Sequence, residues 1–379
     1  MNYFYSSCFS LFLHLYLEKN YNMEKAKQLF ELFETQGTFE SVAPLGAGLI
    51  NDTYKITTKE GNCPDYLFQR INHAIFQNVE MMQNNIFRVT SHLRKKLEQR
   101  GESDIDRKVL TPIKTKKGDL FYFDGESYWR FMLFIPDTQT IDSVTENSAY
   151  AAGRAFGQFQ CDLSDLPGEP LGETIPNFHN IEFRLQQLHE AIEKDAVGRV
   201  EKVKDLIAEI EKREEELCLP ERLFREGKLI KRINHCDTKV NNMLFDKEGN
   251  FLCVIDLDTV MPGFVLSDIG DFIRTGANTG AEDDDNLDNV NVNLKVVEAY
   301  TKGYLETATF LSPTEKQLLP FGGKLLTYMQ TVRFLTDYIN GDTYYKTKFD
   351  EHNLQRTRAQ FKLLQSIEEH FGEMMEFVK

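Results

Sequence analysis

The sequence predicts an α+β protein of two lobes, with a strand-rich part followed by a longer helical part. Three observations lead to this fold class. Apolar residues alternate between turn residues in the first third of the chain, and they recur at three-and-four spacing in most of the rest. A dense polar stretch, "HCDTKVNNMLFD" at residues 235–246, follows a short apolar run. With 379 residues, of which 41% are hydrophobic and 27% charged, the chain is long enough for two globular lobes.

Charge and cysteine content exclude several classes of function. The net charge of −15 disfavours broad binding to nucleic acids or anionic membranes, because both need a basic surface. The six cysteines are scattered and include no C-x-x-C pair, so they suggest neither a zinc site nor a disulfide framework. We therefore expect reduced thiols and a cytoplasmic protein without nucleic-acid or membrane partners. The oligomeric state is left open.

Residues 1–22 form an apolar stretch that fits no targeting signal. The run is too short for a membrane span, and it lacks the positively charged start and small-residue cleavage site of a signal peptide. Met23 opens "MEKAKQLFELF", whose apolar residues share one helical stripe. We expect the chain proper to begin at Met23, with residues 1–22 a non-native or disordered extension. The alternative is a membrane anchor.

Residues 23–135 are expected to form the smaller lobe. Three strands separated by turns are predicted within residues 39–72, and the helix that follows ends at Gly101, a typical helix stop. Two or three further strands, divided by the turns "KKGD" and "FDGES", complete the lobe. The prediction is one helix packed on an antiparallel sheet.

Residues 136–379 are expected to form the larger, mainly helical lobe. Three-and-four spacing over residues 181–217 predicts helix, with an interruption near Gly198. Residues 229–258 then predict a strand, a loop and a hairpin that turns at "DKEGN". The C-terminal part of the chain returns to a helical pattern.

The polar stretch matches the pattern H-x-D-x-K-x-x-N at His235, Asp237, Lys239 and Asn242, and the hairpin behind it returns to Asp256 in "VIDLD". These residue types suit phosphoryl transfer. A carboxylate such as Asp237 accepts the proton of an attacking hydroxyl and orients its lone pair. Lys239, two residues after this base, neutralises charge that builds on the transferred group.

Asn242 and Asp256 are the candidate metal ligands. An amide oxygen and a carboxylate are hard oxygen ligands suited to Mg²⁺, and a hairpin brings both to the same end of two paired strands. His235 is expected to brace the loop through hydrogen bonds rather than act as a base. Asp258 and Asp271 are candidates for support around the metal, although capping of a helix or loop is favoured for Asp271. The alternative for the whole stretch is a polar turn whose side chains only cap backbone groups.

This combination of loop, hairpin and second aspartate resembles the catalytic and metal-binding segments of the protein-kinase-like fold. In the smaller lobe, "PLGAGLINDTYKI" places Gly46 and Gly48 in a turn where backbone amides approach phosphates, with a simple hairpin turn as the alternative. Arg70, in the next strand, stands where the fold has a phosphate-pairing lysine, and a surface charge is the alternative. The following helix offers Glu80 as its partner, but Glu80 falls early and the alternative is that Asn84 or Asn85 occupies the expected place, so the partner of Arg70 stays open. The adenine is expected near residues 131–136.

Protein kinases themselves fit poorly, because "DLD" replaces D-F-G and no A-P-E-like segment is present. The chain instead resembles the aminoglycoside phosphotransferase and choline kinase superfamily of small-molecule kinases. Within it, the closest resemblance is to the bacterial N-acetylhexosamine 1-kinases. Six stretches that span the chain from about Met23 support this: "GAGLINDTY", "LFQRIN", "IPNFHN", "HCDTKVNNMLFD", "IDLDTVMPGFVLSDIGDFIRTGAN" and "RFLTDYINGDTYY".

The resemblance implies a bilobal protein-kinase-like fold, with ATP and Mg²⁺ as cofactors. It implies phosphorylation of the anomeric hydroxyl of N-acetylglucosamine or N-acetylgalactosamine, without a preference between them. It also implies sugar contacts from Asp237, Arg333 and Tyr344, with a buried contact between helices as the alternative for the last two. Related sequences often have histidine where Leu49 stands, so acceptor choice can differ here.

Two other functions stay open. One is a kinase of the same fold for another small hydroxyl acceptor, such as an amino alcohol, another sugar or an aminoglycoside. The other is a catalytically inactive nucleotide-binding module. The intact Asp237, Asn242 and Asp256 argue against the second of these.

Overall fold

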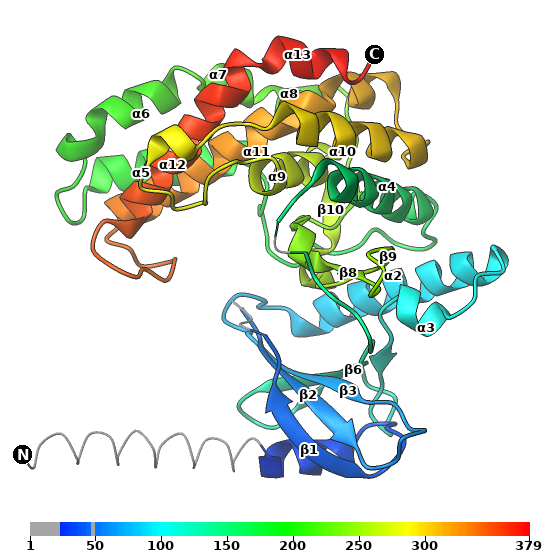
Figure 1. Ribbon diagram of the computed structural model, residues 1–379. Coiled ribbons are helices and arrows are strands. Elements are labelled where there is room, and N and C mark those ends of the chain that lie inside the picture. The colour runs from blue at the N-terminus through cyan, green and yellow to red at the C-terminus, as the bar shows by residue number, and fades with distance from the viewer. Residues whose placement is uncertain (1–22, 47–49, 142) are drawn as a thin grey trace, which may run out of the picture. The chain divides into compact units, whose positions relative to one another are not determined.

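The computed structural model describes residues 23–46, 50–141 and 143–379, and the chain divides after Asp137 into two compact units (Figure 1). Unit 1 contains an antiparallel sheet, and unit 2 is mainly helical. The predicted α+β class, with the sheet in the N-terminal part and helices in the C-terminal part, is confirmed. The expected extension at residues 1–22 lies outside the described residues.

Unit 1 is built on a six-stranded antiparallel sheet in the order β1-β2-β3-β6-β4, with β5 paired to β6. Residues 23–30 are helical, where the apolar stripe predicts a helix. The helix predicted to end at Gly101 is present as α2, which ends at Gln99. Gly101 has a positive φ of 69°, the backbone conformation typical of a glycine that stops a helix. The elements are β1 (Phe39–Pro44), β2 (Asp52–Thr58), β3 (Tyr66–Ile71), α2 (Val79–Gln99), α3 (Ile105–Lys108), β4 (Pro112–Ile113), β5 (Tyr122–Phe123) and β6 (Tyr128–Leu133).

The core of unit 1 forms between the helix at residues 23–30 and one face of the sheet. Ala26, Leu29 and Phe30 of the helical stripe pack in one cluster with strand residues that include Phe68 and Trp129. The rings of these last two stack at 4.8 Å between their centroids. Burial of this stripe is what stabilises a short helix that would be marginal alone.

The adenine contact expected near residues 131–136 stays a prediction, and the side chains of that segment differ in exposure. Phe131, the first residue of the segment expected to border the adenine, is 1% exposed and belongs to the core. Side chains of a strand alternate between its two faces, and Phe131 points to the same side as the buried Trp129. Only Leu133 and Phe134 of that segment have partly exposed side chains before Pro136.

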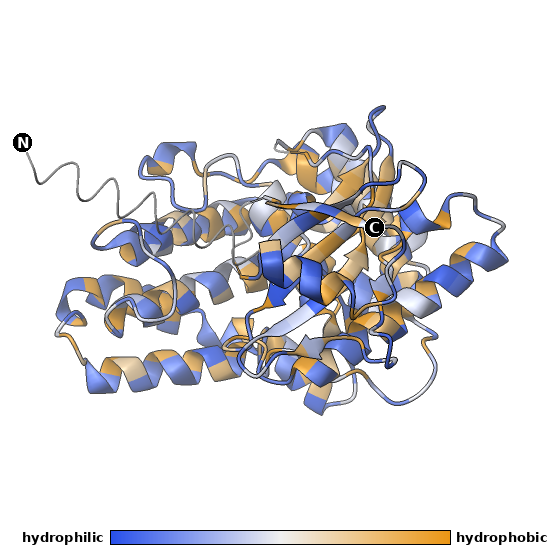
Figure 2. Cartoon of the chain, turned by 90° about the horizontal axis from the view of Figure 1, so that it is seen from below, coloured by the Kyte–Doolittle hydropathy of each residue, from blue (hydrophilic) through white to orange (hydrophobic). Residues whose placement is uncertain are grey.

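Unit 2 consists mainly of amphipathic helices, on which hydrophobic and hydrophilic residues lie side by side along each ribbon (Figure 2). The predicted helix over residues 181–217 is present in several pieces, and Gly198 lies between the first two. The helices are α4 (Glu146–Leu163), α5 (Ile181–Lys194), η1 (Glu201–Val203), α6 (Lys204–Glu211), α7 (Glu214–Leu217), α8 (Leu219–Arg225), α9 (Leu266–Gly276), η4 (Leu287–Asn289), α10 (Leu294–Thr307), α11 (Pro313–Ile339), α12 (His352–Glu369) and α13 (Phe371–Glu376).

The strands of unit 2 form two small antiparallel pairs around the polar stretch. β7 pairs with β10, and β8 pairs with β9 as the predicted hairpin. Two short 3-10 helices connect them. The elements are β7 (Arg232–Asn234), η2 (Val240–Asn242), β8 (Met243–Phe245), β9 (Phe251–Val254), η3 (Leu257–Thr259) and β10 (Met261–Gly263).

Two helix pairs in unit 2 touch through their backbones, and α9 and α11 form one of them. A Cβ added at Gly270 of α9 would lie 2.2 Å from the carbonyl oxygen of Gly322 in α11. In the other pair, a Cβ at Gly153 of α4 would lie 2.1 Å from the carbonyl oxygen of Tyr300 in α10. Only glycine permits so close an approach. The position of α9 is therefore fixed by backbone contact.

Within residues 23–46, 50–141 and 143–379, no helix has the length and apolar character needed to cross a membrane. The five described cysteines are free thiols, and two of them, Cys236 and Cys253, are buried.

Candidate active site

The 235–242 loop follows β7 and is braced by His235, whose side chain is fully buried. The Nε2 of His235 lies 2.8 Å from the carbonyl oxygen of Ile255, and its Nδ1 accepts from the Asp237 amide at 3.3 Å. Because a carbonyl only accepts and an amide N–H only donates, these contacts place the ring proton on Nε2. The ring also meets that of Phe156 edge-on at 5.6 Å. The bracing role expected for His235 is confirmed.

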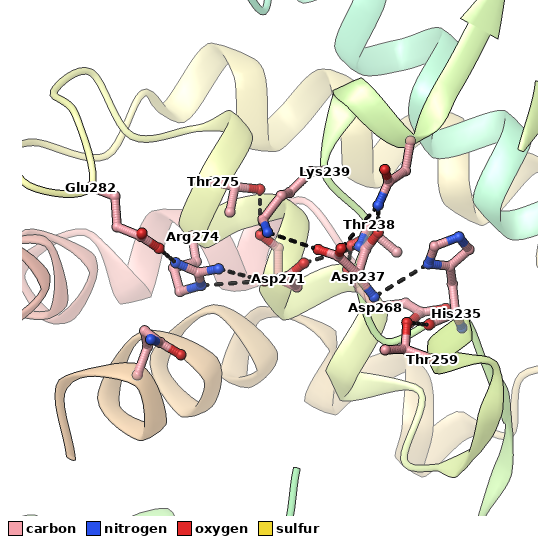
Figure 3. A network of polar contacts seen from close by, with 12 residues as sticks. His235, Asp237, Thr238, Lys239, Thr259, Asp268, Asp271, Arg274, Thr275 and Glu282 are labelled. Atoms are coloured by element: carbon pink, nitrogen blue, oxygen red, sulfur yellow. Dashed lines mark hydrogen bonds and ion pairs between the residues drawn. The ribbon is translucent and has the colours of Figure 1, made fainter. Parts of the chain in front are cut away.

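Two aspartates of α9 bind the backbone N–H groups of this loop (Figure 3). Asp268 accepts from the amides of His235 at 2.9 Å and Cys236 at 2.8 Å. Asp271 accepts from the amide of Thr238 at 3.0 Å, and the Thr238 hydroxyl donates to the Asp268 carbonyl at 2.6 Å. Buried N–H groups outside regular structure need such acceptors. Helix α9 therefore determines the shape of the loop.

Asp268 is fully buried and receives a third hydrogen bond inside the protein. The side-chain amide of Gln160, on α4, donates to it at 2.8 Å. Gln160 is itself held by the hydroxyl of Tyr304, which donates to its side-chain oxygen. Burial raises the pKa of Asp268 to about 6, while the hydrogen bonds from His235 and Cys236 oppose that shift.

Asp271 is the second buried anchor, and its charge is paired. Arg274 donates to one of its oxygens through Nε at 3.2 Å and Nη2 at 2.9 Å, and also to Glu282 at 2.7 Å. Burial alone would raise the pKa of Asp271, but the Arg274 guanidinium and the Lys239 ammonium outweigh it and hold the pKa below its ordinary value. Of the two capping roles expected for Asp271, the structure has loop capping.

Asp237 is partly exposed, and each of its carboxylate oxygens has a partner. The Lys239 ammonium lies 3.1 Å from Oδ1, and the Asn242 side-chain amide donates to Oδ2 at 3.0 Å and to the backbone carbonyl at 2.9 Å. The charge of Asp237 is the main cause that raises the pKa of Lys239, against the effect of burial. A carboxylate has about four lone-pair sites, so two contacts leave room for a hydroxyl donor.

The β8–β9 hairpin brings Asn242 next to Asp256. The amide of Ile255 donates to the Asn242 carbonyl at 2.9 Å, so the two predicted ligands lie at the same end of the hairpin. The Asn242 side chain donates through its nitrogen, and its oxygen receives no hydrogen bond from the described residues. Asp256 is exposed and has a positive φ of 59°, which turns the chain just after β9.

This donor set fits Mg²⁺ that is completed by other ligands. Within the described part of the chain, no group of three or more His, Cys, Asp or Glu side chains is arranged to hold a metal. Mg²⁺ is commonly held by one or two carboxylates together with substrate phosphates and water. One carboxylate and one amide oxygen at the end of the hairpin match that pattern, whereas they do not make a complete protein cage.

The predicted nucleotide residues lie in unit 1. Gly46, just after β1, has a φ of 70° and open space where a Cβ would point, so its backbone conformation rather than packing favours glycine. Gly48 and Leu49 lie outside the described residues. Arg70 has a half-exposed side chain and pairs with Asp52, its direct neighbour across the β2–β3 ladder, at 2.7 Å through Nε.

Arg333 and Tyr344 are brought together through a third residue. The Arg333 guanidinium lies over the ring of Tyr345 at 5.6 Å and over the ring of Phe178 at 5.2 Å. The rings of Tyr344 and Tyr345 meet edge-on at 4.8 Å. Tyr344 is 62% exposed, so it is not a buried contact between helices. An exposed ring beside a guanidinium is available to a ligand.

Asp337 fixes the chain that carries these tyrosines. It is 4% exposed and lies two residues before the end of α11. Its carboxylate accepts from the amides of Thr343 at 2.9 Å, Tyr344 at 2.8 Å and Tyr345 at 2.9 Å. The side-chain amide of Asn353, in α12, donates to it at 2.8 Å.

Sequence patterns missed the anchoring roles of Asp268 and Asp337. Both lie in apolar helical segments, "VLSDIGDFI" and "RFLTDYI". A carboxylate on the buried face of a helix needs partners, because an unpaired buried charge is costly. That mismatch between residue type and helical face is the signal that identifies them.

The fold of the chain matches solved kinase structures over nearly their whole length. An amicoumacin kinase in complex with AMP-PNP, Ca²⁺ and Ami gives a TM-score of 0.58 at 14% identity, covering 91% of this chain and 92% of that one. The microcompartment-associated aminopropanol kinase gives 0.57 at 14% identity, covering 94% and 99%. An aminoglycoside phosphotransferase from Alicyclobacillus acidocaldarius gives 0.57 at 10% identity, covering 91% and 94%. At these identities the likeness shows a shared fold.

The sequence itself matches a family model. The model described as "phosphotransferase enzyme family" covers residues 41–303, which is more than half of the chain and includes the 235–242 loop and Asp256. The chain therefore belongs to the phosphotransferase enzyme family.

Proposed function

We propose that the protein is a small-molecule kinase that transfers the γ-phosphoryl group of ATP to the anomeric hydroxyl of an N-acetylhexosamine, giving the sugar 1-phosphate. Family membership supports phosphotransfer. The observation that supports the active site most strongly is the arrangement of Asp237, Lys239 and Asn242 on a loop held by two buried aspartates. Residues 23–135 are assigned the nucleotide phosphates, and residues 136–379 the catalytic, metal and sugar groups.

In this proposal Asp237 is the base that receives the proton of the acceptor hydroxyl. Its side chain is partly exposed, and its orientation is fixed by the hydrogen bond from Asn242 at 3.0 Å. Lys239 keeps its proton, since the neighbouring carboxylate raises its pKa. It therefore provides a positive charge 3.1 Å from the base, where negative charge develops on the transferred group.

ATP and Mg²⁺ are the proposed cofactors. The structurally similar amicoumacin kinase was solved with AMP-PNP and Ca²⁺, a nucleotide analogue and a divalent cation. Here Asn242 and Asp256 would hold the metal, which neutralises phosphate charge during transfer. The backbone at Gly46 and Gly48 and the Arg70 guanidinium are the groups proposed for the nucleotide phosphates.

Arg333 and Tyr344 are proposed as acceptor-binding residues together with Asp237. Arg333 has donors for sugar hydroxyls or for an acetamido carbonyl, and the exposed ring of Tyr344 offers a flat apolar face and a hydroxyl. Asp337 would act as a positioning residue, because it binds the backbone of the segment that carries Tyr344.

The direct test incubates the full chain with ATP, Mg²⁺ and N-acetylglucosamine or N-acetylgalactosamine, and locates the phosphate by phosphorus NMR. We expect a sugar 1-phosphate, with phosphorus coupled to the anomeric proton, and no product when the metal is chelated. A product phosphorylated on a primary hydroxyl, or no product from either sugar, would overturn the assignment of the substrate.

A second candidate is a kinase of the same family for another small hydroxyl acceptor. The names of the structural neighbours favour it, since they are kinases of amicoumacin, aminopropanol and aminoglycosides. A panel of amino alcohols, aminoglycosides and neutral sugars, assayed by ADP release, separates the two candidates. No ADP release with any acceptor would support an inactive nucleotide-binding module instead.

A further inference from the structure

Arg333 is surrounded by neutral groups and aromatic rings. Its Nη1 donates to the side-chain oxygen of Gln330 at 3.1 Å, and its guanidinium lies over Phe178 and Tyr345. Among the described residues no carboxylate lies within 4 Å of it. The positive charge of this half-buried side chain is therefore not neutralised by an adjacent partner.

A second guanidinium with the same property lies beside it. Arg184, in α5, donates from Nε at 3.3 Å and Nη2 at 3.0 Å to the carbonyl of Phe178, whose ring Arg333 covers. Its Nη1 donates to Gln187 at 2.8 Å, and it too has no carboxylate within 4 Å in the described part of the chain. Burial, together with the smaller effect of the Arg333 charge, lowers the pKa of Arg184 to about 10. The guanidinium groups of Arg184 and Arg333 thus both contact Phe178, and neither has a carboxylate beside it.

His179 adds an unused polar atom to this cluster. Its ring stacks on Phe178 at 4.4 Å, and its Nδ1 is buried without a hydrogen-bond partner. Burial lowers the pKa of His179 to about 3; the Asp271 carboxylate opposes this shift, and Arg333 and Arg184 strengthen it. The ring is therefore neutral near pH 7. An orphaned buried nitrogen in a native fold calls for an explanation, such as a ligand that is not present.

The cluster lies next to the 235–242 loop. His179 and Cys236 line the same small pocket, and Asp271, whose charge acts on His179, binds the amide of Thr238, the neighbour of Asp237. Three carboxylates in this region are paired with cations: Asp271 and Glu282 with Arg274, and Glu173 with Lys231. Glu221 lines the same pocket as His179 and has no ion pair among the described residues. The uncompensated positive charge is therefore that of Arg184 and Arg333 themselves, which have no carboxylate within 4 Å in the described part of the chain.

We propose that Arg184, Arg333 and His179 select the acceptor by charge: they bind an uncharged acceptor through a carbonyl-type oxygen and exclude one that carries an ammonium group nearby. The inference rests on the proposed function in that this cluster binds the acceptor of the kinase reaction. It adds Arg184 and His179 as specificity-determining residues. It also predicts that the enzyme rejects the cationic acceptors that other kinases use, because an ammonium group beside the two guanidinium groups would be repelled without a carboxylate to offset the charge.

The experiment compares three sugars that differ only at carbon 2: N-acetylglucosamine, glucose and glucosamine, at a pH below the pKa of the glucosamine amine. We expect kcat/KM to fall from the first to the second and again from the second to the third, by about tenfold or more at the last step. The second step isolates repulsion, because glucose lacks the carbonyl as glucosamine does. Wild-type enzyme that uses glucosamine as well as glucose would overturn the inference.

Variants assign the effect to Arg184. Arg184→Met is expected to reduce the preference for glucose over glucosamine, and Arg184→Lys to restore it, because the charge returns. Arg225→Met is the matched control, since Arg225 pairs with Glu182 at 2.7 Å through two nitrogens and should leave the preference unchanged. An unchanged preference in Arg184→Met with native circular dichroism contradicts the assignment.

Failure of the proposed function is distinguishable from failure of this inference. If none of the three sugars is phosphorylated, the charge selection is tested by the acceptor that the panel of amino alcohols, aminoglycosides and neutral sugars identifies. An uncharged acceptor would support the charge selection while the N-acetylhexosamine assignment fails. Phosphorylation of a cationic acceptor such as aminopropanol would overturn the inference.

Discussion

Two loops of unit 2 are anchored by the same chemistry. In the 235–242 loop, Asp268 and Asp271, in the first two turns of α9, bind three backbone N–H groups. In the segment 343–345, Asp337 binds three consecutive backbone N–H groups from the last turns of α11. In both, a buried carboxylate takes the place of the regular secondary structure that would otherwise pair these groups.

The two loops differ in what their side chains do. His235 and Thr238 are 0% exposed and serve the loop itself, whereas Tyr344 is 62% exposed and has its ring free for a ligand. The 235–242 loop is thus fixed in backbone and in most side chains. The 343–345 segment is fixed in backbone and at Tyr345, whereas the side chain of Tyr344 is exposed. We infer that the first loop governs the rate of transfer and the second governs acceptor affinity.

The largest effect is expected from Asp268→Asn. The amide has only one acceptor oxygen and would turn a donor toward a loop amide, so the loop would shift and misplace Asp237. A displacement of about 1 Å can cost roughly 100-fold in rate. We expect kcat to fall by that order, with little change in the KM of the acceptor, as measured by coupled steady-state kinetics. Asp205→Asn, at an exposed aspartate of α6, is the control and should behave as wild type.

Gly270→Ala tests whether α9 must be held by its neighbour. The new Cβ would lie 2.2 Å from the Gly322 carbonyl oxygen, so the two helices have to separate. We expect the free energy of unfolding to fall by about 1–3 kcal/mol, measured by urea titration. Gly372→Ala, in α13, is the matched control because nothing lies within 4 Å of the added atom. Equal midpoints for both variants would contradict backbone contact between α9 and α11.

Asp337→Asn should have a smaller and different effect. Loss of one charge-assisted hydrogen bond costs roughly 1.5–3 kcal/mol, enough to raise the acceptor KM about tenfold. Since Asp337 does not contact the 235–242 loop in any hydrogen bond of the structure, kcat should change little. A variant with lowered kcat and unaltered KM would remove the distinction between the two loops.

The smallest expected effect is a pH dependence of kcat that arises from Asp268 and therefore from the 235–242 loop only. Burial raises the pKa of Asp268 to about 6, so the carboxylate that binds the loop amides is lost as the pH falls through that value. We expect kcat to decline below about pH 6 in the wild type, and this step to be absent from the residual activity of Asp268→Asn. The same acid limb in both enzymes would exclude Asp268 as its origin.

The sign of the linked stability separates this decline from unfolding. The ordinary pKa of an aspartate is 3.8, so between about pH 4 and 6 the folded chain binds a proton at Asp268 that the unfolded chain does not. Ionised Asp268 therefore lowers the free energy of unfolding at neutral pH, and this penalty disappears on acidification. The contribution of Asp268 predicts lower activity without lower stability in that range.

Local patterns in the sequence were sufficient for the elements and for the polar motif. The strands around β1 to β3, the helix α2 and the β8–β9 hairpin follow from alternation, helical spacing and turn residues. The hairpin also brought Asn242 and Asp256 to the same end, as its spacing predicted. These features depend on residues close together along the chain.

Contacts between segments far apart in the chain could not be predicted from local sequence patterns. Asp268 lies on a helix that follows the hairpin, and its partner Gln160 lies on α4, so no local spacing reveals the pair. The cluster of His179, Arg184 and Arg333 joins residues from two helices and the segment before α5. The packing of Phe131 in the core of unit 1 likewise joins a strand to a helix about 100 residues earlier in the chain.

The most direct test of the account is Asp237→Asn, because the amide keeps the shape of the side chain and cannot accept the acceptor proton as a base. We predict that turnover falls by between about 100-fold and 10,000-fold while the Kd for AMP-PNP stays that of the wild type. Asp237→Asn with full activity and unchanged nucleotide affinity would contradict the assignment of Asp237 as the base.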